Sequence, residues 1–545
     1  MTERDRVIVI GGGHNGLVCA AYLARAGREV VVLEAAPRVG GATVTREFSP
    51  GFKVSAGAHL LYGLDPVVAK DLKLASHGLS FARMGLLTVA LARSGSPLVL
   101  NGVAVEQGEL SAKDRAALVQ FDARMRRFAA LLARQHRRVP SRLAWQSWRE
   151  AMSAALLAFD IRMLGRRDMR EFLRIATMNI FDVLEECFES AQLKGALALD
   201  GVLGTNLGPR SGHTVLSMLH RLSGQRNALD SEGGTGGVGT ERGMRDRSRL
   251  RSGGEQSSGL LLPRGGMGAV TTAMAAAASA AGAEIRISSP VASLLLDGDR
   301  IAGVRLETGE ELHASAVVSN ADPKTTFLKL LGARHLETEF AQRVDHIRIK
   351  GTAAKLHLAL SGLPNFARVD PAHVGERLII ADDLDYIDQA FNPAKYREYS
   401  ERPVLEISIP SVHDTTLAPS GKHVLSAIVQ YAPYDLAGGW NARRDKFRDT
   451  VLGVLEDHAP GLRDLVIDAE LLAPPDLERE FRMTGGHWHH GEITLDQYLM
   501  LRPVPGAAQY ATPIRNLYLC GAGSHPGGGV MGCAGYNAAK VVLRA

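Results

Sequence analysis

Short apolar runs bounded by glycine stand near both ends of the 545-residue chain. The first extends from Val7 to Ile10 and leads through a glycine-rich turn into an alanine-rich stretch. A second apolar run, Val30 to Leu33, follows after the length of one helix and one turn. Runs this short without alternating polar positions are typical of buried parallel strands. The pattern therefore predicts a strand–helix–strand unit at the start of the chain, and Leu517 to Leu519 predicts another strand near its end.

The first glycine-rich turn has the spacing of a dinucleotide-binding loop. Gly11 permits a tight turn, Gly13 lets the backbone approach a pyrophosphate, and Gly16 lets the helix and the strand pack closely. The helix that begins near His14 and Asn15 would aim its positive end at the phosphates. A GxGxxG motif alone is weak, and the alternative is a glycine turn kept for packing. Its position between a strand and a helix favours the nucleotide site.

The residues after the second apolar run distinguish between two dinucleotides. Glu34 ends that run, where its carboxylate can accept hydrogen bonds from ribose hydroxyls. The next residues include Arg38, Gly40 and Gly41, a signature that resembles two-domain flavoproteins and that NAD dehydrogenases usually lack. The two glycines would let the loop run close beneath the flavin, and Arg38 could pair with phosphate oxygens. We therefore predict FAD as the cofactor.

The C-terminal apolar run is followed by a second glycine-rich turn. Gly521 and Gly529 lie within it, and a helix is expected from about Val530. Backbone N–H groups of Val530 and Met531 could then bond the flavin O2 atom and stabilise negative charge on reduced flavin. The alternative is a loop required only for packing. We favour the flavin interpretation because the N-terminal signature explains this segment.

The segments between these ends alternate between helical and strand-like patterns. Helical spacing at 121–143 and 162–189 predicts a helical insertion, and alternating runs between Thr352 and Gly438 predict an antiparallel or mixed sheet. Residues 461–486 are linker-like. We divide the chain into cofactor-domain segments 1–70, 259–335 and 496–545, a helical part of the substrate domain at 71–225, a disordered Gly, Ser and Arg-rich loop at 226–258, and a sheet part at 336–495.

Another glycine cluster begins the middle segment of the cofactor domain. Gly265, Gly266 and Gly268 precede an alanine-rich helix, but no second apolar strand ends in an acidic residue at the required place. We therefore do not predict an NAD(P) site there. The segment instead returns the chain to the FAD domain, with Val291 near the adenine and a hairpin turn at Asp297-Gly298-Asp299.

Composition excludes some partners. A formal net charge of +5 over this length gives no argument for nucleic acid. No run approaches the roughly 18 apolar residues of a membrane span, and residues 1–6 are too short for a signal peptide, so a cytoplasmic protein is expected. Peripheral membrane contact stays an alternative, because arginines alternate with four apolar side chains that could dock on anionic lipid, namely Phe128, Leu131, Leu132 and Trp145. A solvated helix face is the favoured interpretation of this stretch.

Histidines supply the candidate catalytic groups. His487 and His489 lie in the stretch GGHWHHGE, and His59 follows the first flavin segment. Each could face the cavity as an acid or base, although a structural histidine is the more common role. We predict no metal site, because no carboxylate or cysteine stands at ligand spacing and strand alternation would separate His489 from His490.

The longer motifs resemble the phytoene-desaturase-like FAD-dependent oxidoreductases over nearly the whole chain. These motifs are HNGLVCAAYLARAG, PRGGMGAV, VVSNADP, GGHWHHGEITLDQ and NLYLCGAGSHPGGGVMG. The likeness is greatest to the relatives named for a pyridine nucleotide-disulfide oxidoreductase domain, followed by the flavin-dependent carotene ketolases. It implies an α/β fold of the amine-oxidase and glutathione-reductase type, with a discontinuous Rossmann-like FAD domain and a mixed-sheet substrate domain. The four cysteines form no C-x-x-C pair, which leaves the disulfide label unsupported.

The chain departs from these relatives at Tyr536, where they usually carry an arginine, and we expect a flavin contact to be missing there. The leading hypothesis is an enzyme whose FAD accepts a hydride at N5 from a C–H bond of an apolar substrate. Oxygen or a quinone would then reoxidise the flavin. The alternatives are a carotenoid desaturase or ketolase, an amine-oxidase-like enzyme, and a flavin-stabilised regulatory protein. The sequence does not predict the oligomeric state.

Overall fold

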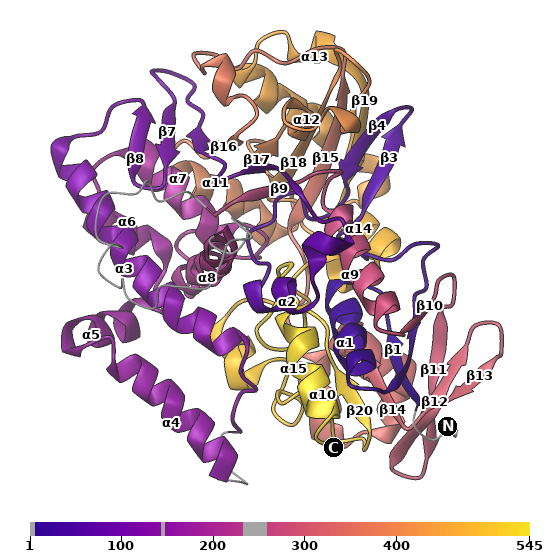
Figure 1. Cartoon of the computed structure of the whole chain (residues 1–545). Helices are drawn as coiled ribbons and strands as arrows, with labels where there is room; N and C mark the ends of the chain where they lie inside the picture. The colour runs from indigo at the N-terminus through magenta and orange to yellow at the C-terminus, as the bar shows by residue number, and fades with distance from the viewer. Residues whose placement is uncertain (1–5, 143–147, 233–258) are drawn as a thin grey trace, which may run out of the picture.

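A five-stranded parallel sheet gathers strands from both ends and the middle of the chain. The computed structural model describes residues 6–142, 148–232 and 259–545. The strand order is β10-β2-β1-β14-β20, formed by Glu284–Arg286, Glu29–Leu33, Arg6–Ile10, Ala316–Ser319 and Leu517–Leu519. The predicted strand–helix–strand unit and the predicted C-terminal strand are confirmed and lie in one sheet. The C-terminus lies at the end of the molecule that holds this sheet (Figure 1).

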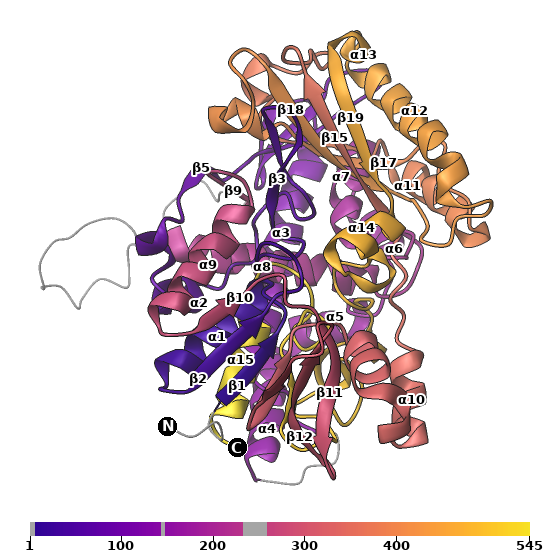
Figure 2. The same cartoon turned by 90° about the vertical axis from the view of Figure 1, so that its right-hand side faces the viewer.

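The two faces of this sheet are covered differently. Helices α1 (His14–Arg25), α9 (Gly268–Ala280) and α15 (Cys533–Val542) pack on the face that carries Val7 and Val9. The other face, which carries Ile8 and Ile10, packs against the hairpin sheet β11 (Val291–Asp297), β12 (Arg300–Leu306) and β13 (Glu311–His313). Figure 2 shows the helices and the hairpin sheet on opposite sides. The alternating side chains of fully buried strands thus supply two hydrophobic cores.

A mixed eight-stranded sheet forms the centre of the second part of the fold. Its order is β19-β15-β18-β17-β16-β6-β7-β8. The central strands come from the region predicted as a sheet: β15 (Ala353–Leu360), β16 (Arg377–Ile380), β17 (Val404–Ser408) and β18 (His423–Gln430). Two of our expectations were wrong here. The region 71–225 is not only helical, because it supplies β6 (Thr88–Ala90), β7 (Leu98–Asn101) and β8 (Ala104–Gln107), and the linker-like 461–486 supplies the edge strand β19 (Val466–Leu472).

A group of helices packs beside this sheet, around the largest hydrophobic core of the described residues. It comprises α3 (Ala112–His136), α4 (Trp148–Arg162), α5 (Arg166–Ile175), α6 (Ile180–Cys187), α7 (Ala191–Val202) and α8 (Thr214–Glu232). The last residues of α8 occupy the start of the predicted loop 226–258, so 226–232 are helical rather than irregular. The rest of that loop, 233–258, lies outside the described residues.

The apolar side chains of α3 that we considered for membrane docking are buried. Phe128, Leu131 and Leu132 are at most 3% exposed and belong to the core, because this face of the helix packs against α8. Trp145 lies outside the described residues. Phe128, Leu131 and Leu132 therefore cannot dock on a bilayer in this fold. Within the described parts of the chain, no helix is long and apolar enough to cross a membrane.

The remaining elements connect these layers. They are β3 (Thr45–Ser49), β4 (Phe52–Ser55), β5 (Phe81–Met84), β9 (Leu261–Pro263), α2 (Pro66–Asp71), α10 (Thr338–Asp345), α11 (Leu384–Phe391), α12 (Trp440–His458), α13 (Leu462–Leu465) and α14 (Pro474–Phe481). At the start of α9, the N–H of Met267 donates to Ser55 Oγ at 3.0 Å and that of Gly268 to Thr45 Oγ1 at 2.9 Å. This glycine cluster therefore docks on the β3–β4 hairpin.

Candidate functional site

A cavity of about 680 Å³ lies between the five-stranded and the eight-stranded sheets. One end is lined by Glu34 and Val291, and the other by side chains of β15, β17 and β18. The volume is in the range of small-molecule and cofactor sites. Residues from the first glycine-rich turn and from the C-terminal turn line the same cavity, so the two predicted ends of the site are brought together.

The first turn has the close packing that its glycines predict. Gly11 has a φ of +92°, a conformation that residues with a side chain rarely adopt. A Cβ on Gly16 would lie 2.1 Å from the carbonyl oxygen of Gly11, so only glycine lets α1 approach the strand this closely. Gly13 lines the cavity and forms a bridge with Gly40, and Gly41 lines it beside them. Asn15 also lines the cavity at the N-terminus of α1.

The carboxylate of Glu34 closes this turn. Its Oε2 accepts a hydrogen bond from the N–H of Gly12 at 2.7 Å, and its Oε1 accepts one from the N–H of Ala36 at 2.8 Å. The side chain lines the same cavity end as Val291. Two backbone donors therefore fix its orientation, and each oxygen keeps a further lone pair with which to accept a hydrogen bond. Arg38, in contrast, is exposed and does not line the cavity.

The C-terminal turn differs in detail from our expectation. Gly521 packs against the backbone of Asn320, and Gly529, with a φ of +121°, lines the cavity together with Val530. The helix begins at Cys533 rather than Val530. The N–H of Met531 donates to the carbonyl of Gly529 at 2.9 Å, so it is not free for a ligand as we expected.

Position 536 lies where α15 packs on α1. The ring of Tyr536 contacts that of Tyr22 with centroids 5.0 Å apart, and Lys540 Nζ lies 3.9 Å from its centroid. Tyr536 does not line the cavity. The side chain at this position therefore packs α15 against α1, and the missing flavin contact stays a prediction.

His14 is a half-buried cavity group whose environment the sequence did not disclose. Its Nε2 has no hydrogen-bond partner among the described residues, and the side chain lines the cavity. Burial, with a contribution from nearby His490, lowers the pKa of His14 to about 4. The imidazole is therefore neutral at pH 7 and able to donate to or accept from a ligand.

His59 belongs to a buried charged cluster at the sheet end of the cavity. Its Nε2 lies 3.1 Å from Oε2 of Glu406 on β17, and its Nδ1 has no partner among the described residues. Burial and the charge of Lys355 lower the pKa of His59 to about 4. Arg221 and Arg377 also donate to Glu406, at 2.5 and 2.7 Å.

Sequence analysis missed these partners of His59. Glu406 stands in the apolar strand VLEIS and Lys355 in AAKLHLAL, and a charged residue in such a strand is rarely buried without a role. That signal was present in the sequence. The sequence did not show that the strands of Lys355 and Glu406, β15 and β17, both pair with β18.

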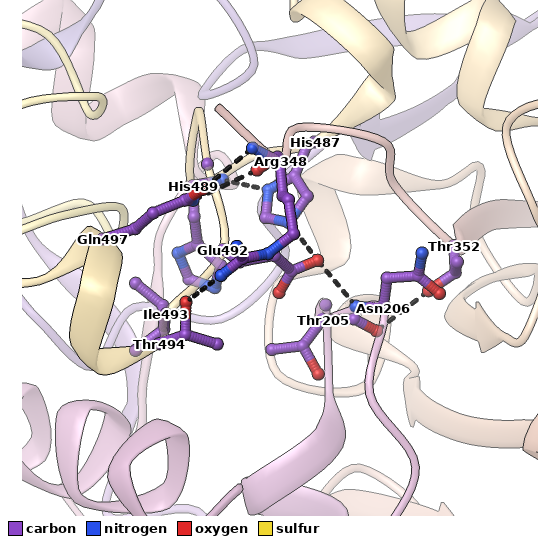
Figure 3. A network of polar contacts seen from close by, with 12 residues as sticks. Thr205, Asn206, Arg348, Thr352, His487, His489, Glu492, Ile493, Thr494 and Gln497 are labelled. Atoms are coloured by element: carbon purple, nitrogen blue, oxygen red, sulfur yellow. Dashed lines mark hydrogen bonds and ion pairs between the residues drawn. The ribbon is translucent and has the colours of Figure 1, made fainter. Parts of the chain in front are cut away.

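The His487–His490 stretch is a loop rather than a strand, so the alternation argument does not apply. Glu492 holds it against the 205–206 turn, since its Oε1 accepts from the N–H of Asn206 at 2.9 Å and lies 3.2 Å from Nε2 of His487 (Figure 3). His487 is buried behind the cavity, whereas His489 and His490 line it. No group of His, Cys, Asp or Glu side chains suited to a metal ion occurs in the described portion of the chain.

Comparisons with known proteins agree with this geometry. The family model described as flavin containing amine oxidoreductase matches residues 16–543. Pyridine nucleotide-disulfide oxidoreductase domain-containing protein 2 of Mus musculus is 36% identical over 98% of this chain and 93% of its own length. A phytoene desaturase (lycopene-forming) of Pseudescherichia vulneris is 25% identical over 97% of this chain and 96% of that protein. The structure of cyclohexylamine oxidase from Brevibacterium oxydans covers 99% of both chains with a TM-score of 0.57 and 16% identity, which supports the fold.

Proposed function

From the premise that the chain belongs to the flavin-containing amine oxidoreductases, we propose that this FAD-dependent enzyme oxidises a C–H bond of a predominantly apolar small molecule. One observation carries the proposal. A single cavity extends from the glycine-rich turn of α1 to the wall formed by β15, β17 and β18. A dinucleotide at the first end and a substrate at the second would therefore share one cavity.

The residues at the first end fit FAD. The N-terminus of the 12-residue helix α1 opens on the cavity beside Gly13 and Gly41, which leaves room for a diphosphate close to the backbone. Glu34 would accept from the adenosine ribose, and the unpartnered Nε2 of His14 is available to the same ligand. When bound, FAD supplies the hydride acceptor.

The second end favours a substrate with an apolar body. Leu203, Ala354, Ile428 and Ile493 line it, together with the ring of Trp488. Phytoene, which appears in the name of one relative, is a hydrocarbon, and apolar walls of this kind would hold such a molecule by excluding water. Oxygen or a quinone remains our proposed acceptor of the electrons that the reduced flavin must pass on before the next turnover.

His59 is the proposed base. Glu406 is ionised, so Nε2 of His59 carries the hydrogen of their bond and Nδ1 retains a lone pair inside the cavity wall. Loss of a hydride from one carbon and a proton from its neighbour leaves a double bond. Nδ1 would receive the proton, and the adjacent carboxylate would stabilise the imidazolium that results.

An anaerobic screen tests the proposal. The FAD-loaded protein is mixed with carotenoids, alcohols, fatty acyl compounds and amines, and the loss of visible flavin absorbance is followed. We expect rapid bleaching by an apolar compound. A protein that retains no flavin after FAD is supplied would overturn the proposal, and bleaching by amines alone would replace it with an amine oxidase.

A further inference from the structure

Helix α4 exposes a stripe of large apolar side chains to solvent. Met152, Leu156 and Phe159 lie on the helix and Met163 follows its end, at spacings of four, three and four residues that place them along one side. Their exposed fractions lie between 39% and 63%. Figure 1 shows α4 at the margin of the molecule. Exposed apolar patches of this kind mark sites of interaction with a protein or a membrane.

The opposite side of α4 is anchored to the rest of the fold. Leu157, Ile161 and Leu164 pack against the largest hydrophobic core. The buried carboxylate of Asp160 accepts a hydrogen bond at 2.7 Å from Arg138, in the segment that follows α3. These contacts fix the rotation of the helix about its own axis. The apolar stripe therefore stays on the outer side of the folded protein.

The segment formed by α4 and α5, residues 148–175, also carries arginines that no carboxylate neutralises. Each of its four carboxylates is already paired with an arginine, in the ion pairs Glu150–Arg142, Asp160–Arg138, Asp168–Arg127 and Glu171–Arg174. Four exposed arginines form no ion pair with any described residue, namely Arg162, Arg166, Arg167 and Arg170. A basic surface therefore follows the apolar stripe directly along the chain.

We propose that α4 docks on the surface of a bilayer that contains anionic lipids. The apolar stripe enters the boundary between headgroups and acyl chains, and the exposed arginines bind lipid phosphates. A helix that lies in the plane of this boundary needs apolar side chains beside basic ones, and the α4–α5 segment supplies both. No described residue of this segment lines the cavity, so the inference does not depend on the proposed oxidation.

The charges favour lipid over a second copy of the chain. Two α4 stripes could cover each other's apolar side chains, but each copy would bring four exposed arginines and, from this segment, only carboxylates that are already paired. An anionic bilayer supplies a phosphate for each arginine, and its mobile lipids arrange themselves around the side chains. Such attraction weakens as salt is added.

Flotation with lipid vesicles tests the proposal. The FAD-loaded full-length protein is mixed with vesicles of phosphatidylcholine alone or of equal parts phosphatidylcholine and phosphatidylglycerol, and the bound fraction is measured. We expect binding to the mixed vesicles to be at least tenfold tighter, and to weaken as salt rises. Leu156→Ser combined with Phe159→Ser should weaken it at least tenfold. Arg166→Gln combined with Arg170→Gln should do the same.

Matched double variants elsewhere on the surface are the controls. Leu363→Ser combined with Tyr396→Ser removes two exposed apolar side chains, and Lys53→Gln combined with Lys446→Gln removes two exposed cations. Both should bind the mixed vesicles as the wild type does. All four double variants should hold as much flavin per chain as the wild type, because none of the substituted residues lines the cavity. Equal flavin content excludes a folding defect as the cause of weaker binding.

Three results would overturn the proposal. Failure of the wild type to bind the mixed vesicles, which contain no protein, would favour an acidic protein as the partner. Equal binding to both kinds of vesicle, or unchanged binding of either α4–α5 variant, would remove the site. A wild-type dimer in gel filtration that Leu156→Ser with Phe159→Ser converts into a monomer would assign the stripe to a second copy. The anaerobic flavin screen is independent of each of these results.

Discussion

The imidazole Nε2 of His59 lies 3.1 Å from Oε2 of Glu406, although 347 positions separate the two residues in sequence. Burial alone would raise the pKa of Glu406, but Arg221, Arg377 and His59 together hold it well below its ordinary value. The ionised carboxylate therefore accepts the hydrogen of Nε2. This bond orients the ring and leaves Nδ1 as its only proton acceptor.

Replacement of His59 by asparagine tests its role as a base. The rate of anaerobic flavin reduction by the identified substrate should fall by about 10²-fold or more, the typical contribution of a positioned base. FAD content should be unchanged, because His59 lies at the sheet end of the cavity. His313→Asn, on an exposed strand, is the control and should react at the wild-type rate. An unaltered rate in His59→Asn would assign the proton to another group.

A methyl group at Gly16 should disrupt the FAD end. In Gly16→Ala the new Cβ would lie 2.1 Å from the Gly11 carbonyl oxygen, so α1 must move away from the strand and from the phosphate-binding turn. We expect at least a tenfold loss of FAD affinity, measured as flavin retained per chain after gel filtration. Gly453→Ala in α12 is the matched control, since its nearest neighbour is 3.7 Å away. It should retain FAD and gain about 0.5–1 kcal/mol in stability.

The sequence predicted those parts of the site that a local pattern encodes. Gly11, Gly16 and Glu34 lie within one strand–helix–strand unit, where spacing alone determines which atoms meet. Lys355 and Glu406 meet the cavity because two strands pair with β18, and nothing local specifies that pairing. The sequence also did not predict β6–β8 and β19, because their short apolar runs resemble linkers and only pairing at the edges of the eight-stranded sheet makes them strands. The start of α15 was misplaced because Gly532, with a φ of +78°, precedes it and delays the helix.

Arg502 is expected to be required for stability. It is 1% exposed, and its guanidinium donates to the carbonyls of Glu492 and Gln497, each at 3.0 Å, and of Ala522 at 3.0 Å. These bonds join the histidine loop to the C-terminal turn. Burial lowers its pKa to about 10, so the group stays charged at pH 7.

Loss of this group leaves several buried carbonyls without donors. Arg502→Met should lower the free energy of unfolding by about 3 kcal/mol or more. Arg502→Lys should lose less, because an ammonium can replace some of these bonds. Urea unfolding of the FAD-loaded protein measures both. The control is Arg515→Met, because the side chain of Arg515 is 68% exposed and paired with Asp299. This variant should lower the free energy of unfolding by no more than about 1 kcal/mol. Equal losses at 502 and 515 would contradict the prediction.

The buried histidines predict that acid destabilises the fold. Burial lowers the pKa of each of the following to about 4: His14, His59, His220, His490 and His525. Between pH 6.5 and about 4 the unfolded chain therefore binds more protons than the folded one. The free energy of unfolding falls as the pH falls through this window, by roughly 3 kcal/mol for one such histidine that titrates independently.

His490 allows this to be tested at one position. Its φ of +53° lies in the left-handed region, which asparagine tolerates better than most residues, so His490→Asn keeps the backbone geometry. Because the variant lacks one group that must be deprotonated in the folded state, its loss of stability between pH 7 and 5 should be smaller by about 2 kcal/mol. Urea titrations at pH 7, 6 and 5 with saturating FAD measure the difference. The control His313→Asn should lose as much stability between pH 7 and 5 as the wild type. An equally steep loss of stability in His490→Asn would show that His490 is protonated in the native protein.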